Sequence, residues 1–108
     1  MRLRFAQDDE YYDVLKQSQE EDGVELWLVK HRQPETMAVV SGDDRWIVPY
    51  VYEVFEFLDG EMYNCYPTSE RVAMEMLAGR LPLDASNTWR IGDFEDRVHI
   101  GWMGTDET

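Results

Sequence analysis

Carboxylates are the most numerous side chains in this sequence that could do chemistry. Twenty-three Asp and Glu residues face ten Lys and Arg residues, which gives a formal net charge of −13. Two clusters, Asp43-Asp44 and residues 93–96, offer oxygen ligands of the kind that Mg²⁺ and Ca²⁺ take. Neither follows the twelve-residue calcium loop, with its alternating oxygen ligands and terminal Glu. Because acidic residues are common in turns, we interpret both clusters as turns and predict no metal site.

Covalent catalysis would require Cys65, the single cysteine, to lie beside His31 or His99. Nothing in their spacing favours that arrangement. We expect Cys65 to be a small buried side chain in a strand and both histidines to lie on the surface. No phosphate-binding Gly-rich loop is present, and one cysteine with two histidines is too few for the common zinc frameworks. The sequence therefore predicts a protein that is not an enzyme and carries no cofactor.

The acidic residues carry the functional signal because they gather in two segments. The first predicted contact patch consists of Asp8, Asp9, Asp13, Glu20, Glu21 and Asp22. The second lies among Tyr and Phe residues and consists of Glu53, Glu56, Asp59 and Glu61. Negative charge of this size disfavours direct binding to nucleic acids and anionic membranes, which are themselves polyanions. A basic protein partner is favoured instead.

A surface that mixes carboxylates with aromatic rings can imitate the phosphate array of DNA. We therefore predict an inhibitor or adaptor that occupies a basic nucleic-acid-binding protein or nuclease complex in competition with DNA. The composition is similar in character to that of small phage-encoded inhibitors of restriction or CRISPR complexes and of nuclease immunity proteins, although no motif links this chain to them.

Two other interpretations remain open. Acidic surfaces also keep proteins soluble at high salt, and lysine is scarce here, at positions 16 and 30 only. Alternatively, the chain is a small ligand-binding or enzyme-accessory domain whose pocket uses Trp46, Tyr50 and Tyr52. The distribution of acids discriminates between salt adaptation and DNA mimicry, because salt adaptation predicts an even spread and mimicry predicts one acidic face.

The length and composition predict a single domain over residues 1–108. The apolar fraction is 44%, with four Trp, six Tyr and four Phe, which is enough for a core. No apolar run approaches the ~18 residues that span a bilayer. The amino-terminal residues lack the apolar segment of a signal peptide. The expected location is the cytoplasm, and the single cysteine fits a reducing compartment.

Hydrophobic patterning predicts an α+β fold, mostly an antiparallel sheet with two helices. Strands are expected at residues 1–5, 24–32, 36–41, 45–48 and 61–66, and a terminal hairpin at residues 88–91 and 97–103. One helix is expected over residues 8–20, and another after Ser69 with Val72, Ala73, Met76 and Leu77 on its apolar face. Residues 49–58 suit either a strand or an amphipathic helix, and the strand is favoured.

Overall fold

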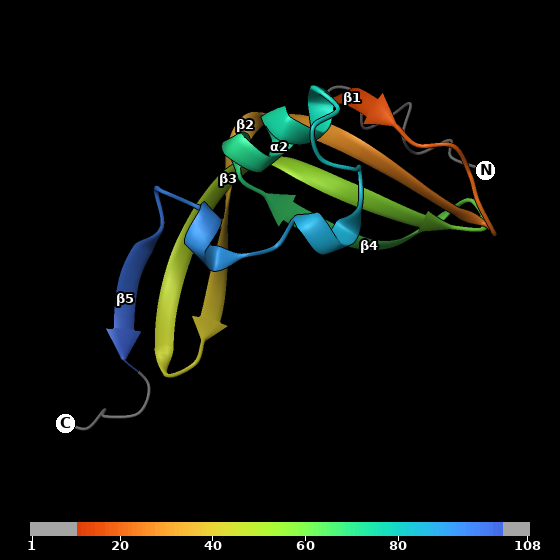
Figure 1. The fold of residues 1–108 in the computed structure, drawn as a ribbon. Coiled ribbons are helices and arrows are strands. Elements are labelled where there is room, and N and C mark those ends of the chain that lie inside the picture. Colours follow the sequence, from red (N-terminus) through yellow and green to blue (C-terminus); the bar gives the residue numbers. More distant parts are fainter. Residues whose placement is uncertain (1–10, 103–108) are drawn as a thin grey trace.

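A computed structural model describes residues 11–102, which form a bent antiparallel sheet with one α-helix (Figure 1). The strands are β1 Tyr12–Gln17, β2 Val24–Ser41, β3 Asp44–Leu58, β4 Glu61–Thr68 and β5 Val98–Trp102. Helix α2 spans Glu70–Leu77, and 3₁₀ turns follow at Ala85–Asn87 and Ile91–Asp93. The strand order is β1-β2-β3-β4, and β5 also pairs with β3. The antiparallel sheet is as predicted, but residues 11–102 contain one α-helix where two were expected.

Two of the hairpin turns are set by Asp-Gly pairs. Asp22 and Asp59 have φ values of 54° and 52°, and the glycines that follow them have φ values of 82° and 88°. Positive φ at both central residues is type I′ geometry, which matches the twist of the flanking strands and favours Asp-Gly. Residues 49–58, ambiguous in the sequence, form part of β3 and enter the Asp59-Gly60 turn directly. The predicted strand hairpin there is confirmed.

Strands β2 and β3 form one long hairpin that bends in the middle. Lys30 pairs with Tyr52 and Glu35 with Tyr50, so residues 31–34 of β2 lie opposite the single residue Val51 of β3 and form a bulge. The bulge accommodates a proline, which cannot donate to a regular ladder. The sequence predicts two strands separated by residues 33–35, whereas the structure has one bent strand. Figure 1 shows the resulting arch, whose lower arm holds the β2–β3 turn and β5.

Strand β1 replaces the first predicted helix. Tyr12 pairs with His31 and Gln17 with Trp27, so β1 extends the sheet beside β2. The Tyr12 ring is 4% exposed and meets the Phe55 ring edge-on at 5.1 Å between centroids. Sheet pairing and burial of this ring outweigh the weak helix propensity of the segment. The expected strand at residues 1–5 and the start of the expected helix lie outside the described residues.

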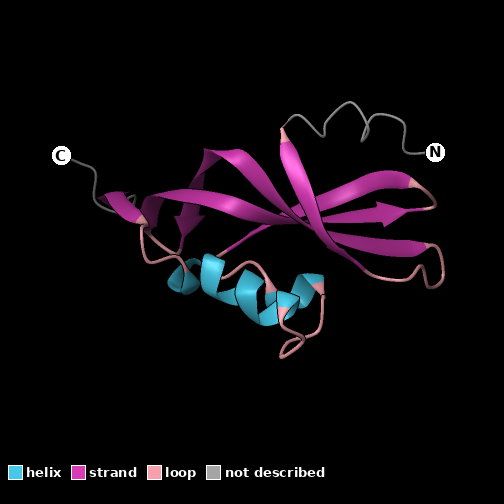
Figure 2. Cartoon of the chain, turned by 90° about the horizontal axis from the view of Figure 1, so that it is seen from above, coloured by secondary structure: helices cyan, strands magenta, loops and turns pink. Residues whose placement is uncertain are grey.

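Alternation along β2 and β3 divides the core between the two faces of the sheet. Trp27 and Val29 pack with Phe55 and Phe57 on one face. Leu28 packs on the other face with the residues of α2. The predicted alternation of β2 is confirmed. Figure 2 shows α2 and the 3₁₀ turns together on one side of the sheet.

Helix α2 forms as the sequence predicts. Ser69 caps it, because its Oγ accepts a hydrogen bond from the Val72 backbone N–H at 3.2 Å. Val72, Ala73 and Met76 are buried against the sheet, whereas Leu77, expected on the same face, is exposed. Lys16 Nζ of β1 donates to the Met76 carbonyl at 2.7 Å, which places a positive charge at the negative end of the helix dipole.

The predicted terminal strand at residues 97–103 forms as β5, but the predicted hairpin with residues 88–91 is wrong. Residues 88–91 form no strand, and the Trp89 ring packs on Phe94 at 5.2 Å between centroids. Strand β5 instead pairs with residues 44–47 of β3, on the same edge that β4 occupies further along. The part of this β3 edge that β4 leaves unpaired supplies the backbone hydrogen-bond partners of β5. None of the helices within residues 11–102 is long and apolar enough to cross a membrane.

Candidate protein-binding surface

Two acidic turns lie side by side at the end of the sheet opposite the β5 arm. The Asp59 backbone N–H donates to the Gly23 carbonyl at 2.8 Å. A Cβ atom at Gly23 would lie 2.5 Å from Asp59 Oδ1, so that carboxylate would have to move, and the φ of 82° at Gly23 itself favours glycine. The contact joins the β1–β2 connection to the β3–β4 turn. We call the exposed carboxylates gathered there the acidic tip: Glu20, Glu21, Asp22, Asp59 and Glu61.

Among residues 11–102, no cation compensates the charge of the acidic tip. No Lys or Arg occurs between Lys16 and Lys30 or between Arg45 and Arg71, the stretches that contain both turns. Within residues 11–102, the ion pairs formed by Lys, Arg and His involve acids elsewhere and none of the tip. Unpaired like charges at this density produce a strong negative potential, which attracts basic partners over a Debye length.

A hollow of about 590 Å³ opens beside the acidic tip. Its lining combines carboxylates with aliphatic side chains: Glu21, Asp22 and Asp84 with Val24, Leu26 and Leu83, together with Ser18 and Gln19. Lysine and arginine have the matching composition, because an apolar stem carries a charged head. Asp84 and Leu83 come from the loop after α2, and the sequence offers no signal that this loop reaches the turn.

The structure brings together five of the ten predicted contact residues and places three others elsewhere. Glu20, Glu21 and Asp22 of the first predicted patch meet Asp59 and Glu61 of the second. Asp13 lies at the far end of β1 and pairs with Arg32 at 2.8 Å. Glu56 is half-buried and accepts a hydrogen bond from the Tyr66 hydroxyl at 2.7 Å. Asp8 and Asp9 lie outside the described residues.

Glu53 belongs to the interior and not to a contact patch. It is 6% exposed, and its Oε1 lies 2.6 Å from His31 Nε2. The predicted patch is wrong at this residue because Glu53 shares a strand face with Phe55 and Phe57. His31, expected on the surface, is largely covered and supplies the partner that a buried carboxylate requires.

Cys65 lies next to this buried pair. The sequence predicts a buried cysteine, but Cys65 is exposed on β4. Partial burial of the thiol raises its pKa to about 11, and the charge of Glu53 and a hydrogen bond to it contribute in the same direction. Burial, with the charges of Glu53 and Glu35, likewise raises the pKa of Tyr50 to about 12. Both groups stay protonated at neutral pH, so the cluster does not present an activated nucleophile.

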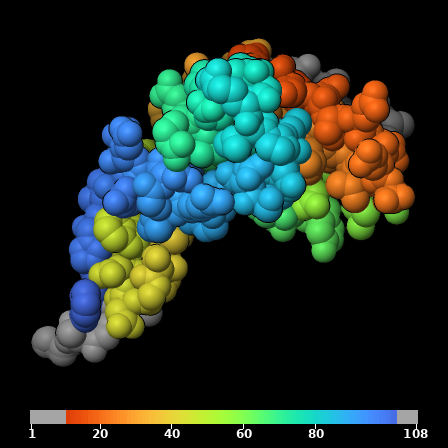
Figure 3. Space-filling model, in the orientation of Figure 1, coloured from red at the N-terminus to blue at the C-terminus, as the bar shows by residue number. Residues whose placement is uncertain are grey.

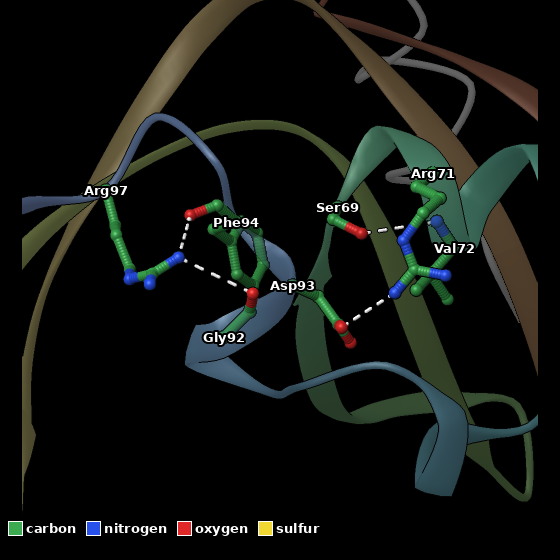
Figure 4. Close-up of polar contacts among 7 residues, drawn as sticks. All are labelled: Ser69, Arg71, Val72, Gly92, Asp93, Phe94 and Arg97. Carbon is green, nitrogen blue, oxygen red and sulfur yellow. Dashed lines mark hydrogen bonds and ion pairs between the residues drawn. The ribbon is translucent and has the colours of Figure 1, made fainter.

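In each acidic cluster considered as a metal site, one carboxylate has a structural partner. Asp44 Oδ1 contacts His99 Nε2 at 2.7 Å. Arg71 donates to Asp93 at 2.7 Å, which ties this turn to α2, and Arg97 donates to the Phe94 carbonyl at 2.9 Å (Figure 4). No group of three or more metal-ligating side chains converges within residues 11–102.

Of the three aromatic residues considered for a ligand pocket, two share a hollow. Tyr50 and Tyr52 border a space of about 330 Å³ together with Thr68 and Ser69. Trp46 lies apart, where its ring packs against His99 and beneath the Arg97 guanidinium.

Comparison with models of known protein families, with curated proteins and with solved structures finds no match to this chain.

Proposed function

We propose that this protein is a non-catalytic binding protein whose acidic tip docks onto a basic surface of a nucleic-acid-binding protein or nuclease complex. The observation that carries the proposal is the union of two acidic turns that are remote in sequence, through the contact between Asp59 and Gly23. Occupation of a surface that otherwise holds phosphates would inhibit the partner by competition with DNA.

The surroundings of the tip support recognition by more than charge. Leu58 is 41% and Tyr63 is 65% exposed, and both lie next to the tip on β3 and β4. The adjacent hollow adds Val24, Leu26 and Leu83. Apolar and aromatic groups bordered by charge are typical of protein-binding surfaces, where charge steers association and apolar contacts add affinity. General adaptation to high salt would not require this segregation of acids from cations.

The experiment compares two doubly substituted proteins that carry the same change in net charge. The tip variant is Glu21→Lys with Glu61→Lys, and the matched control is Glu35→Lys with Glu95→Lys, both exposed and away from the tip. Each tagged protein is used to capture partners from a lysate across a salt gradient, and duplex DNA is added as competitor.

We expect the native protein and the control to retain a nucleic-acid-binding protein that salt or DNA releases, and the tip variant to lose it. Equal recovery by both variants, or complexes that DNA does not displace, would contradict the proposal.

A second candidate function is the binding of a small ligand in the hollow beside Tyr50 and Tyr52. Convergent tyrosine rings and hydroxyls fit a small ligand with apolar and polar parts. A fragment screen by NMR tests this candidate, and it requires hits whose chemical-shift changes centre on Tyr50 and Tyr52. Hits that map elsewhere would contradict it.

A further inference from the structure

Strand β4 leaves one of its edges open. It pairs with β3 from Glu61 to Thr68, and no other described strand pairs with it. Tyr63, Asn64 and Cys65 are all exposed along this strand. An unpaired strand edge presents backbone donors and acceptors that can pair with another extended chain.

The amide of Cys65 identifies the outward-pointing backbone groups of this edge. Its N–H donates to the side-chain Oδ1 of Asn64 at 2.9 Å, a bond within β4 itself. Asn64 is itself held by the Tyr66 hydroxyl, to which its Nδ2 donates at 3.1 Å. The backbone of Pro67, two residues after Cys65, also points outward, and because proline has no N–H this position leaves no unpaired donor on the edge. The hydrogen-bond acceptor of the Cys65 amide is thus the neighbouring Asn64 side chain, which a backbone carbonyl of a partner can replace.

A hollow of about 410 Å³ borders this edge. It is lined by residues 37–40 of β2, residues 64–67 of β4 and the Trp89 side chain. Successive side chains of a strand point to opposite faces of the sheet. Because consecutive residues of each strand line the hollow, their main chains border it as well as their side chains. None of the lining side chains is charged. Figure 3 shows the inner side of the arch as a recess between the β5 arm and the body of the molecule.

Strand β4 connects this uncharged hollow to the acidic tip. It begins at Glu61, which belongs to the tip, and its residues 64–67 line the hollow. At about 3.3 Å per residue, the distance from Glu61 to Cys65 is about 13 Å, the length of four extended residues.

We propose that the open edge of β4 binds an extended segment of the partner protein by strand addition. Apolar side chains of that segment enter the hollow at Trp89, and basic side chains at one end lie beside Asp59 and Glu61. This inference rests on the proposed function, because the acidic tip selects the basic end. Charge complementarity excludes a second copy of this chain as the occupant, since pairing would bring together two chains of net charge −13.

The test uses eight-residue peptides that alternate valine and threonine and carry two arginines at either the amino or the carboxyl end. The matched controls have the same sequences with alternate backbone amides N-methylated, which removes hydrogen bonding and keeps charge and side chains. Affinity is measured by fluorescence anisotropy, and the Cys65 amide is followed by NMR and hydrogen exchange.

We expect an unmethylated peptide to bind about tenfold more tightly than its N-methylated control, which corresponds to about 1.4 kcal/mol. Exchange of the Cys65 amide should slow on binding. The variant Cys65→Pro should lose the difference between the peptides, and Cys65→Ser should keep it. If Cys65→Pro does not fold, the methylated peptides alone decide the result.

Equal binding of methylated and unmethylated peptides, or no binding of either up to about 1 mM, would overturn strand addition. The tip variant Glu21→Lys with Glu61→Lys separates this result from failure of the proposed function. If methylated and unmethylated peptides bind the native protein equally and that variant loses both, the tip binds by charge alone and strand addition is wrong. If it binds both as the native protein does and methylation still weakens binding, the edge is the binding site and the role of the tip is wrong.

Discussion

The thiol of Cys65 provides a quantitative check on the cluster that contains Glu53. Partial burial, the charge of Glu53 and a hydrogen bond to Glu53 together raise the Cys65 pKa from 9.0 to about 11. At pH 8 a rise of two units lowers the thiolate fraction about 100-fold. A more basic thiolate is also about six- to tenfold more nucleophilic, because the Brønsted coefficient is about 0.4–0.5. The net expectation is alkylation about tenfold slower than for an ordinary thiol.

The assay measures the rate of alkylation by iodoacetamide from pH 7 to 12, for the native protein and for the chain unfolded in guanidinium. We expect the pH midpoint of the native protein to lie near the pKa of about 11. Glu53→Gln keeps the shape of the side chain and removes its charge, so the midpoint should fall, though not to that of the unfolded chain because burial remains.

The matched control is Glu56→Gln, since Glu56 contacts Tyr66 and not Cys65. It should leave the midpoint unchanged. Equal alkylation rates for the native and unfolded protein at pH 8, or equal midpoints for Glu53→Gln and Glu56→Gln, would refute this account of the cluster.

Three further predictions concern stability. Phe57 is fully buried, so Phe57→Ala should lower the free energy of unfolding by about 3–5 kcal/mol. The control Val98→Ala, on exposed β5, should change it by less than about 0.5 kcal/mol. Urea unfolding measures both variants, and similar losses would contradict the assigned core. Ser69→Ala removes the cap of α2 and should cost about 1 kcal/mol, which Ser69→Asp should largely avoid in the same assay. Folding raises the pKa of Cys65 to about 11 and that of Tyr50 to about 12, so the stability that these protonated groups contribute is complete below pH 9 for Cys65 and below pH 10 for Tyr50. It is lost as the pH rises through the pKa values of the folded state. Melting temperatures measured from pH 8 to 12 should therefore fall, and a flat profile would contradict the shifts.

Local sequence signals predicted the elements that depend on neighbouring residues. The Asp59-Gly60 turn suits φ > 0 at both positions and closes a hairpin. Ser69 and the apolar spacing after it specify α2 in the same way. Alternation along β2 identified its two buried faces. Each of these signals acts over a few residues, so the chain contains the information without any tertiary contact.

Some of the errors had a usable signal. In a strand with a period of two, Glu53 shares its face with Phe55 and Phe57, and that alternation marks it as an interior residue rather than a contact residue. The same alternation places Cys65 opposite Phe55 on the adjacent strand. Residues 49–58 were ambiguous between helix and strand, and strand alternation assigns a face to Glu53 only once the segment is known to be a strand.

Other features had no signal in the sequence. Residues 12–17 suit a short helix as well as a strand, and the free edge of β2 decided between them by pairing with the segment and burying Tyr12. Strand β5 bonds to β3 across the fold and not to its sequence neighbours. The hydrogen bonds that fix these segments join residues far apart in the chain, and local propensity does not report on them.

The sequence by itself determined the net charge, the Asp59-Gly60 turn, helix α2 and the two faces of β2 before its bulge, because these follow from residue type and short-range periodicity. The tertiary structure alone decided which acids meet. It placed Asp59 against Gly23 to form the acidic tip, buried Glu53 beside His31, and left the edge of β4 open. The physical reason is that electrostatic fields and strand edges depend on distances between groups, and only the packed sheet sets those distances.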